Sequence, residues 1–254
     1  MADRKLILIS NDDGIHTTGL HTLIDAVRHL GDVIVAAPTA PQSGKSSAIT
    51  VMEPLRIYQR EDYNGAKMYA ISGTPVDCVK LALHTIVPRR PDMVIAGINH
   101  GSNAGNSIIY SGTMGAVFEG CMTGIPSVGY SLLDHSLDAD FSETIPYIKD
   151  ITERVLNHGL PKGVCLNVNF PANVAIKGAK VVRAALGHWT EEYQRYDDPT
   201  QHPFYMLTGT FVMEDPDPES TDIYWLDRQY ASIVPARADQ TATDVMPDIT
   251  KLLQ

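Results

Sequence analysis

Short, continuous apolar runs alternate with segments of helical periodicity over the first half of this chain. A run that is apolar at every position is typical of a strand buried on both faces of a sheet, and parallel strands need long crossover connections that are usually helices. The alternation therefore predicts an α/β protein with a mostly parallel sheet and helices on both faces. Asn64-Gly65, between two short extended runs, also favours a hairpin turn. The strands are expected at residues 6–9, 32–38, 92–99 and 127–132, and the helices at 20–30, 76–87 and 114–122.

The pattern changes beyond about residue 140, where polar turns that contain proline separate shorter extended runs. Few residue types that carry out catalysis cluster in this half. We therefore expect one α/β domain over residues 1–254, with a core at about 1–180 and, at about 181–254, an extension of strands and a terminal helix that serves subunit contacts. The elements expected here are a helix at 141–158, a strand at 164–168, strands over 179–236 and a helix at 244–253.

Composition excludes several kinds of partner and location. The net charge of -10 argues against a nucleic-acid duplex, because proteins that bind one usually display a basic stripe. No segment approaches the roughly 18 apolar residues of a membrane span, and Met1–Lys5 leads into a strand without a signal peptide's apolar region. Three widely spaced cysteines in apolar settings are interpreted as buried thiols in a reducing compartment. We therefore expect a cytoplasmic protein without a membrane partner.

Two adjacent carboxylates, Asp12 and Asp13, directly follow the first predicted strand. In open α/β sheets, ligands bind outside the carboxyl ends of the strands. Both side chains can reach one ligand only if the chain turns at once, and Gly14 permits such a turn. Adjacent carboxylates repel each other unless they are protonated or neutralised, and a hard divalent cation would neutralise them. The alternative is a solvated loop in which an aspartate caps a helix.

Two polar loops follow other predicted strands. Residues 41–47 contain Gly44-Lys45-Ser46, but a phosphate-binding P-loop would need glycine at position 39, where this chain has Thr39. Ser43 on this loop is therefore a candidate ion ligand or an ordinary turn serine. Residues 97–107 are rich in glycine and asparagine but lack the dinucleotide-binding spacing, and no helix is predicted among them. Asn99 offers a neutral oxygen to a cation, and the loop's alternative role is a flexible surface segment.

A fourth polar cluster, residues 110–113, immediately precedes the helix predicted from residue 114. The amides at the start of a helix are unpaired and carry partial positive charge, so this is a potential phosphate site. Ser111 or Thr113 is equally well interpreted as a simple helix cap, which is compatible with phosphate binding.

Taken together, these segments resemble the SurE (survival protein E) nucleotidases in residue identity, order and spacing. Smaller similarities, such as Tyr230–Pro235, extend the resemblance toward the end of the chain. It departs at Ser10, where the family commonly has threonine, and at Ala96, where it usually has serine; neither is a metal ligand of the family. The motifs that carry it are Ser-Asn-Asp-Asp-Gly-Ile (10–15), Ala-Pro-x-x-Pro-Gln-Ser-Gly (37–44), Ser-Gly-Thr-Pro-Val-Asp-Cys-Val (72–79), Gly-Ile-Asn-His-Gly-Ser-Asn (97–103) and Tyr-Ser-Gly-Thr-Met-Gly-Ala (110–116).

The resemblance implies a Rossmann-like fold and a divalent-metal-dependent phosphatase that acts on nucleoside 5′- and often 3′-monophosphates. It places one Mg²⁺ or Mn²⁺ per subunit on Asp12, Asp13, Ser43 and Asn99. It further implies a homodimer or homotetramer in which the C-terminal portion extends or exchanges arms between subunits.

On this basis we expect a water molecule to attack the phosphate in line, with Asp12 or Asp13 orienting or deprotonating it. Lys45 and His100 are weaker candidates for stabilising charge or protonating the leaving group. The residues expected to contact the phosphate are Asn103, Ser107, Ser111, Gly112 and Thr113.

Two other functions remain open at this point. An aspartyl-phosphate phosphatase also has acids after its first strand, but it uses Asp-x-Asp, whereas this chain has Asn11-Asp12-Asp13. A module that senses nucleotides would use the same phosphate cradle without hydrolysis.

Overall fold

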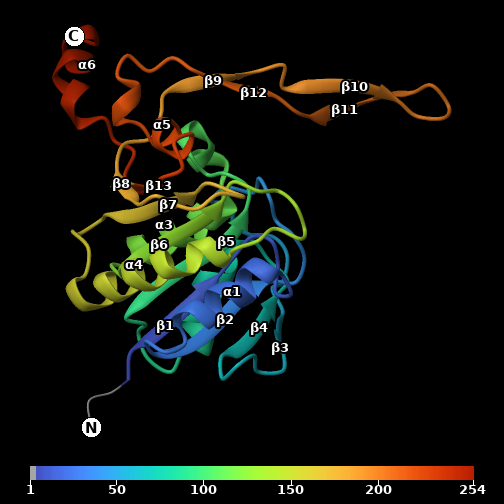
Figure 1. The fold of residues 1–254 in the computed structure, drawn as a ribbon, viewed down its shortest axis with the longest axis vertical. Coiled ribbons are helices and arrows are strands. Elements are labelled where there is room, and N and C mark those ends of the chain that lie inside the picture. The colour runs from blue at the N-terminus through green and yellow to red at the C-terminus, as the bar shows by residue number, and fades with distance from the viewer. Residues whose placement is uncertain (1–3) are drawn as a thin grey trace.

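The computed structural model describes residues 4–254 and contains a nine-stranded sheet with helices packed on both faces (Figure 1). The strands of this sheet are β1 (Leu6–Ser10), β2 (Asp32–Pro38), β3 (Ile57–Gln59), β4 (Lys67–Ile71), β5 (Met93–His100), β6 (Ser127–Leu132), β7 (Cys165–Phe170), β8 (Ala179–Val181) and β13 (Ala231–Ala236). Their order is β3-β4-β2-β1-β5-β6-β7-β13-β8. Strands β4, β2, β1, β5, β6 and β7 are parallel, whereas β3 and β13 run antiparallel to β4 and β7. The predicted mostly parallel α/β fold is confirmed.

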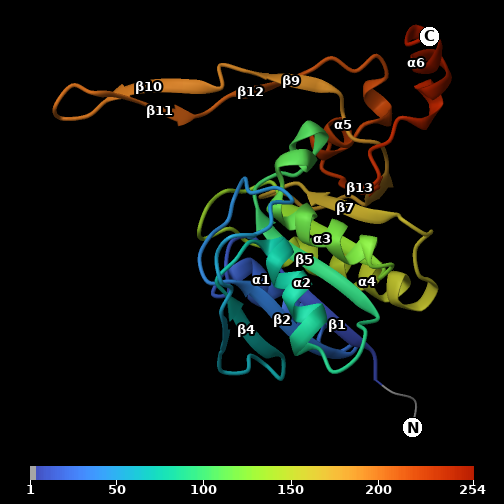
Figure 2. The same cartoon turned by 180° about the vertical axis from the view of Figure 1, so that it is seen from behind.

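Two pairs of helices cover the sheet, one pair on each face (Figures 1 and 2). The pairs are α1 (Thr18–Val27) with α4 (Ile145–His158), and α2 (Pro75–Leu81) with α3 (Gly112–Met122). Successive side chains of a strand point to opposite faces, so β1 serves both layers. Ile7 and Ile9 pack with α1 and α4, and Leu6 and Leu8 pack with α2 and α3. This two-sided burial explains why the strand is apolar from Leu6 to Ile9.

The elements predicted for the first half are confirmed, with small shifts at their ends. The hairpin at Asn64-Gly65 joins the antiparallel strands β3 and β4. Helix α1 ends at Val27 rather than near residue 30, because residues 28–30 form a turn. The helix predicted at 76–87 is α2 followed by a single π-helical segment.

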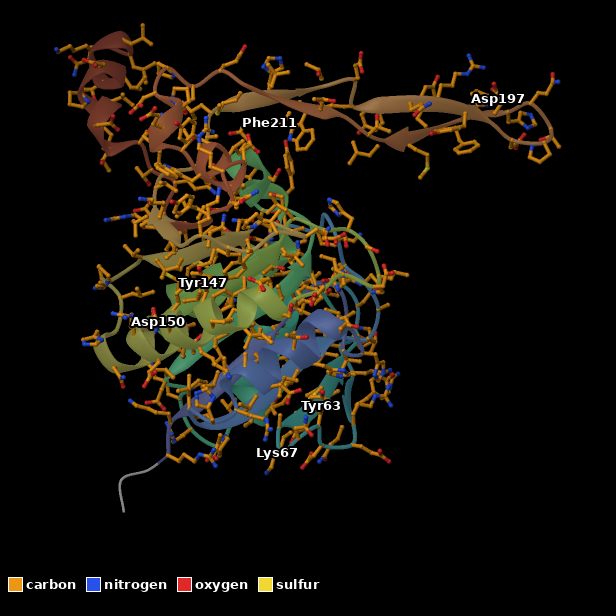
Figure 3. All side chains as sticks on the ribbon, viewed as in Figure 1. Tyr63, Lys67, Tyr147, Asp150, Asp197 and Phe211 are labelled. Carbon is orange, nitrogen blue, oxygen red and sulfur yellow. The ribbon has the colours of Figure 1, made fainter. Side chains whose placement is uncertain are left out.

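Between β8 and β13 the chain leaves the body of the molecule as a long ribbon (Figures 1 and 2). We call residues 187–213 the arm. Figure 3 shows Phe211 in the part of the arm nearer the body and Asp197 toward its far end. The arm consists of β9 (Gly187–Thr190) paired with β12 (Thr210–Met213), and of β10 (Tyr193–Asp197) paired with β11 (Pro203–Leu207).

The expected division near residue 180 is wrong for β13, which belongs to the main sheet rather than to an extension. Residues 231–236 pair with β7 on one side and with β8 on the other. This position depends on pairing with distant strands, which the local sequence does not show. A short helix, α5 (Asp222–Leu226), also lies where only strands were expected, and the terminal helix is α6 (Met246–Leu252).

Over residues 4–254, no helix has both the length and the apolar character needed to cross a membrane.

Candidate active site

The candidate residues meet at the carboxyl edge of the sheet, where the strand order changes direction. Strands β2 and β4 lie on one side of β1 in the sheet. The chain then crosses over, and β5 and β6 lie on the other side of β1. Such a switch point leaves a crevice between neighbouring loops, and ligands bind there in open α/β sheets. Asp12 and Asp13 follow β1 at this point, and Asn99 lies at the end of the adjacent strand β5.

Asn11 shapes the turn that carries the two carboxylates. Its buried side-chain amide nitrogen donates to the Gly14 carbonyl at 2.9 Å and to the Thr17 hydroxyl at 3.0 Å, and its oxygen accepts the Gly14 N–H at 3.2 Å. Gly14 has a φ of +107°, which side chains other than glycine rarely adopt. The chain therefore turns directly after β1, as the sequence predicted.

Each carboxyl is held by a loop from another part of the chain. Asp12 is buried and accepts a hydrogen bond from the Thr113 hydroxyl at the start of α3. A Cβ on Gly112 would lie 2.8 Å from the Asp12 Cβ, so only glycine lets the helix start come this close. Asp13 accepts the backbone N–H of His100 at 3.1 Å, at the end of β5. The acidic pair thus lies between β5 and the N-terminus of α3.

The acidic pair carries an electrostatic cost that its neighbours offset only in part. Burial and the neighbouring charge of Asp13 raise the pKa of Asp12 to about 6, although its hydrogen bond from Thr113 acts in the opposite direction. Burial also raises the pKa of Asp13, against the lowering effects of the His100 amide and of the His100 and His135 side chains. Among the described residues, neither carboxylate forms an ion pair with lysine or arginine. A bound cation would offset this repulsion.

Asn99 and Ser43 are the other predicted metal ligands, and both lie on segments that border the acidic pair. An extra residue in β5 shifts the register between Ala96 and Asn99, a bulge that re-aims the side chains at the strand end. The Asn99 amide nitrogen donates to the Gly101 carbonyl at 2.9 Å, which leaves the side-chain oxygen for a ligand. Ser43 is exposed on the loop after β2, next to Gln42, whose N–H donates to the Asp12 carbonyl at 2.7 Å.

The donor set favours one class of metal. Across residues 4–254 there is no group of three or more His, Cys, Asp or Glu side chains arranged to hold a metal ion. The candidate ligands are instead two carboxylates, one amide oxygen and one hydroxyl, which suit a hard cation such as Mg²⁺ or Mn²⁺. The buried Asp12 and the partly buried Asp13, neither paired with a lysine or arginine among the described residues, therefore fit the group that the sequence implied.

Three of the predicted phosphate contacts lie together at the start of α3. The Ser111 hydroxyl caps the helix by accepting the Met114 N–H at 3.0 Å, so the interpretation as a cap is confirmed. Gly112 and Thr113 follow directly and adjoin Asp12. The positive end of the helix dipole therefore lies beside the acidic pair. This arrangement suits a phosphate bound between the helix N-terminus and a cation.

The other two predicted phosphate contacts lie on the glycine-rich loop. Residues 105–110 form a 3₁₀ turn, which the sequence analysis did not predict, and Ser107 is partly buried within it. Asn103 is buried, and its side-chain nitrogen donates to the Ser131 hydroxyl at 2.7 Å. The amide retains a second N–H beyond this bond.

Two asparagines of β7 position this loop, and the sequence analysis missed both. The Asn169 side-chain oxygen accepts the Asn103 N–H at 2.8 Å, and the Asn167 side-chain nitrogen donates to the Asn103 carbonyl at 2.8 Å. The two asparagines are also joined by a bond of 3.1 Å. In the sequence Cys-Leu-Asn-Val-Asn-Phe the two asparagines are two residues apart, so they lie on the same face of a buried strand. This pattern could have indicated that they position a neighbouring loop.

Comparison with known proteins confirms the resemblance that the motifs indicated. Residues 7–191 match the family described as survival protein SurE. The chain is 49% identical to a 5′-nucleotidase SurE of Phocaeicola vulgatus, over 97% of this chain and 96% of that protein. It is 48% identical to a 5′-nucleotidase SurE of Christiangramia forsetii, over 97% and 96% of the two chains.

A solved structure agrees with the fold as well. The crystal structure of the SurE protein from Aquifex aeolicus matches with a TM-score of 0.83 and 36% sequence identity, covering 98% of this chain and 100% of that one. Motifs, site geometry, near full-length identity and fold thus lead to one conclusion. The chain belongs to the SurE family.

Proposed function

We propose that this chain is a 5′-nucleotidase that uses a divalent cation to hydrolyse nucleoside 5′-monophosphates to nucleoside and phosphate. The observation that carries the proposal is the acidic pair at the switch point: Asp12 is buried, Asp13 is partly buried, and neither pairs with a lysine or arginine among the described residues. Relatives that match almost the whole chain are named 5′-nucleotidase SurE, which supports the reaction and its substrate class.

Asp12, Asp13, Ser43 and Asn99 would hold one Mg²⁺ or Mn²⁺ per subunit. Two carboxylates at one position attract a divalent cation strongly, and the neutral oxygens of serine and asparagine complete part of its coordination. When bound, the cation would supply positive charge that stabilises the transition state of phosphoryl transfer.

The protein's own groups would bind the phosphate and direct the attack on it. Hydroxyl and backbone N–H groups at the start of α3 would donate to the phosphate oxygens, and the helix dipole would favour the negative charge. Asp12 or Asp13 would orient the attacking water and accept its proton, since an ionised carboxylate within hydrogen-bond reach of a water can act as a general base. Ser111, Gly112 and Thr113 would form one side of the phosphate site, and Asn103 and Ser107 the other.

The decisive test is release of inorganic phosphate from AMP by the purified protein. We expect sustained release with Mn²⁺ or Mg²⁺ and a return to background when EDTA is added. Parallel assays with 3′-AMP and with other bases would measure whether the site also accepts 3′-monophosphates.

Each alternative predicts a different result in this assay. Binding of AMP without phosphate release would indicate a nucleotide sensor and would overturn the proposal. Covalent ³²P-labelling of Asp12 would indicate an aspartyl-phosphate enzyme, whereas attack by water leaves the protein unlabelled. Full activity after removal of all divalent cations would show that hydrolysis does not need a metal.

We also propose that the protein is a homodimer or homotetramer in which the arm contacts another subunit. The side chains of β10 and β11 are exposed throughout, and they include Tyr193, Tyr205 and Leu207, which are 67%, 61% and 70% exposed. A two-stranded ribbon is marginally stable alone in water, so apolar contacts from a second copy would stabilise it.

A cytoplasmic location is likewise a proposal. It is supported by three buried cysteines, all of them free thiols, which is the usual state in a reducing compartment.

A further inference from the structure

Asp222 is a fully buried carboxylate that none of the assignments above uses. It lies at the start of α5 and accepts three backbone N–H groups. Its Oδ2 accepts from Gly105 at 2.8 Å, and its Oδ1 accepts from Ala185 at 2.9 Å and from Ile223 at 2.8 Å. One side chain thus joins the glycine-rich loop, the base of the arm and α5.

The bond to Gly105 fixes the point at which the glycine-rich loop enters its 3₁₀ turn. Gly105 is the first residue of the turn over 105–110, which leads directly to the cap residue Ser111. It has a φ of +55°, and a Cβ there would lie 3.2 Å from the Ile223 side chain and 3.3 Å from the Ala185 carbonyl. The loop is therefore packed closely against the same two segments that Asp222 joins.

A second bond ties the loop to the base of the arm. The side-chain nitrogen of Asn106 donates to the carbonyl of Gly187, the first residue of β9. The turn is thus anchored at its start, by Gly105 and Asn106, to residues outside the sheet. The opposite end of the turn leads to the N-terminus of α3.

We propose that Asp222 is a positioning residue for the nucleotidase reaction: it holds the 3₁₀ turn so that Ser107 and Ser111 meet the substrate phosphate. The inference rests on the proposed function, because it takes these serines as phosphate contacts. A carboxylate suits the task, since it can accept from three donors at once, and charge-assisted bonds to backbone N–H groups are strong. The link from Asp222 to the phosphate site then runs through its bond to Gly105.

Asp222→Asn is the sharpest variant, because the two carboxylate oxygens have different partners. The amide oxygen can take the place of Oδ1 and keep the bonds from Ala185 and Ile223. The amide nitrogen then faces the Gly105 N–H, donor against donor, so the link to the loop is lost selectively. We expect the KM for AMP to rise about tenfold with kcat within about twofold, because a displaced cradle weakens ground-state and transition-state binding alike. Inhibition by inorganic phosphate should weaken by the same factor, with Mn²⁺ affinity unchanged.

Asp215→Asn is the matched control. Asp215 is also a buried carboxylate with several partners, but these are Arg183, the Leu186 N–H and the Asp217 N–H, all at the base of the arm. This variant should leave the KM for AMP within about twofold of the unmodified enzyme. Equal rises in KM for both variants, or an unchanged KM in folded Asp222→Asn, would overturn the proposal.

Two further variants keep the test decisive. If Asp222→Asn fails to fold, Asn106→Ala removes the other bond between the start of the turn and the base of the arm and should raise the KM in the same way; an unchanged KM would then overturn the proposal. Ser111→Ala tests the underlying assignment. If Ser111→Ala leaves the KM for AMP and phosphate inhibition unchanged, the proposed phosphate site itself is wrong, whereas failure of the Asp222 variant alone affects only the positioning role.

Discussion

The central sheet and the arm are both built of β-strands, but they are stabilised in different ways. Every residue of β1 and β6 is buried, whereas every residue of β10 and β11 is exposed. The inner strands of the sheet pair on both sides and are covered by helices, but the arm has one partner strand at each point and no covering layer. The sheet is therefore stabilised by a core within this chain, whereas β10 and β11 are held mainly by their pairing with each other.

Local contacts within the arm do not change this contrast. Tyr196 stacks on Phe204 with ring centroids 5.6 Å apart, and Trp189 packs against Phe211 at 5.7 Å. Aromatic pairs of this kind contribute about 0.5–1.5 kcal/mol each beyond the area they bury. That is enough to favour the ribbon's register but small beside the buried core of the body. The edge of the sheet that carries the acidic pair is thus supported by packing on both faces, whereas the arm is supported by its own strand pairs and aromatic contacts.

The largest expected effect comes from Asp12→Asn at the catalytic edge of the sheet. We expect phosphate release from AMP to fall by about 10³-fold, because a ligand and candidate base is lost. The metal-free variant should unfold at or slightly above the temperature of the unmodified protein, since a buried charge beside Asp13 is removed. Phosphate release and thermal unfolding, followed in the same preparation, check both expectations.

Asp150→Asn is the control for that change. Asp150 is exposed on α4, and among residues 4–254 its ion-pair partner is Arg154 in the same helix (Figure 3). The control should retain full activity. Normal turnover by Asp12→Asn would show that the acidic pair is not the catalytic centre.

The contrast between sheet and arm predicts opposite responses to substitutions of apolar residues. Ile95→Ala in β5 should lower the free energy of unfolding by about 3 kcal/mol, because the side chain is fully buried and its loss leaves a cavity. Leu207→Asp in the arm should leave the unfolding of the body within about 0.5 kcal/mol, because Leu207 is 70% exposed. Urea unfolding at low protein concentration measures both values.

Leu207→Asp should instead change the oligomeric state of the protein. Sedimentation of the unmodified protein is expected to give a dimer or tetramer, and Leu207→Asp should shift it toward the monomer because the charge disrupts an apolar contact. An unmodified protein that sediments as a monomer would contradict the assignment of the arm to subunit contacts.

The smallest expected effect is the dependence of metal binding on pH. The pKa of Asp12 is raised to about 6, so below this pH a proton competes with the cation for the carboxylate. Affinity for Mn²⁺ should therefore fall as the pH drops through about 6, by up to about tenfold per pH unit for one proton. Calorimetric titrations between about pH 5 and 7.5 measure this slope, and an affinity that is constant over the range would show that Asp12 does not bind the metal.

Much of the central sheet and its covering helices could be predicted, because the local pattern of apolar residues there follows from which faces are buried. An uninterrupted apolar run such as Leu6–Ile9 is typical of a strand covered on both faces, and helical spacing around Leu23 indicates the covering layer. The position of β13 in the main sheet could not be predicted from its local sequence. Its sequence fits any partly buried strand, and its membership of the sheet is decided by pairing with β7.

In the candidate site, too, some residues could be predicted from the local sequence and others could not. Asp12 and Asp13 were predicted because a turn after a buried strand has a known place in the fold. Asn169 and Asp222 were not, since each acts on a loop far away in the sequence and resembles an ordinary polar residue locally. The sequence thus indicates the groups that do the chemistry more readily than the groups that hold them in place.

The chain enters and leaves the arm region at a single point, and this has a consequence for how such a molecule can change. Arg183 pairs with Thr221 in a parallel bridge, its N–H donates to the Ser220 carbonyl at 3.1 Å, and its carbonyl accepts the Asp222 N–H at 2.9 Å. What lies between is a closed loop, and doubling the length of a flexible loop costs only about 0.6 kcal/mol. The turn between β10 and β11 can be lengthened or replaced while Ala185 and Gly187, at the base of the arm, keep their bonds with Asp222 and Asn106, so the tip of the arm is the natural place to graft a new peptide.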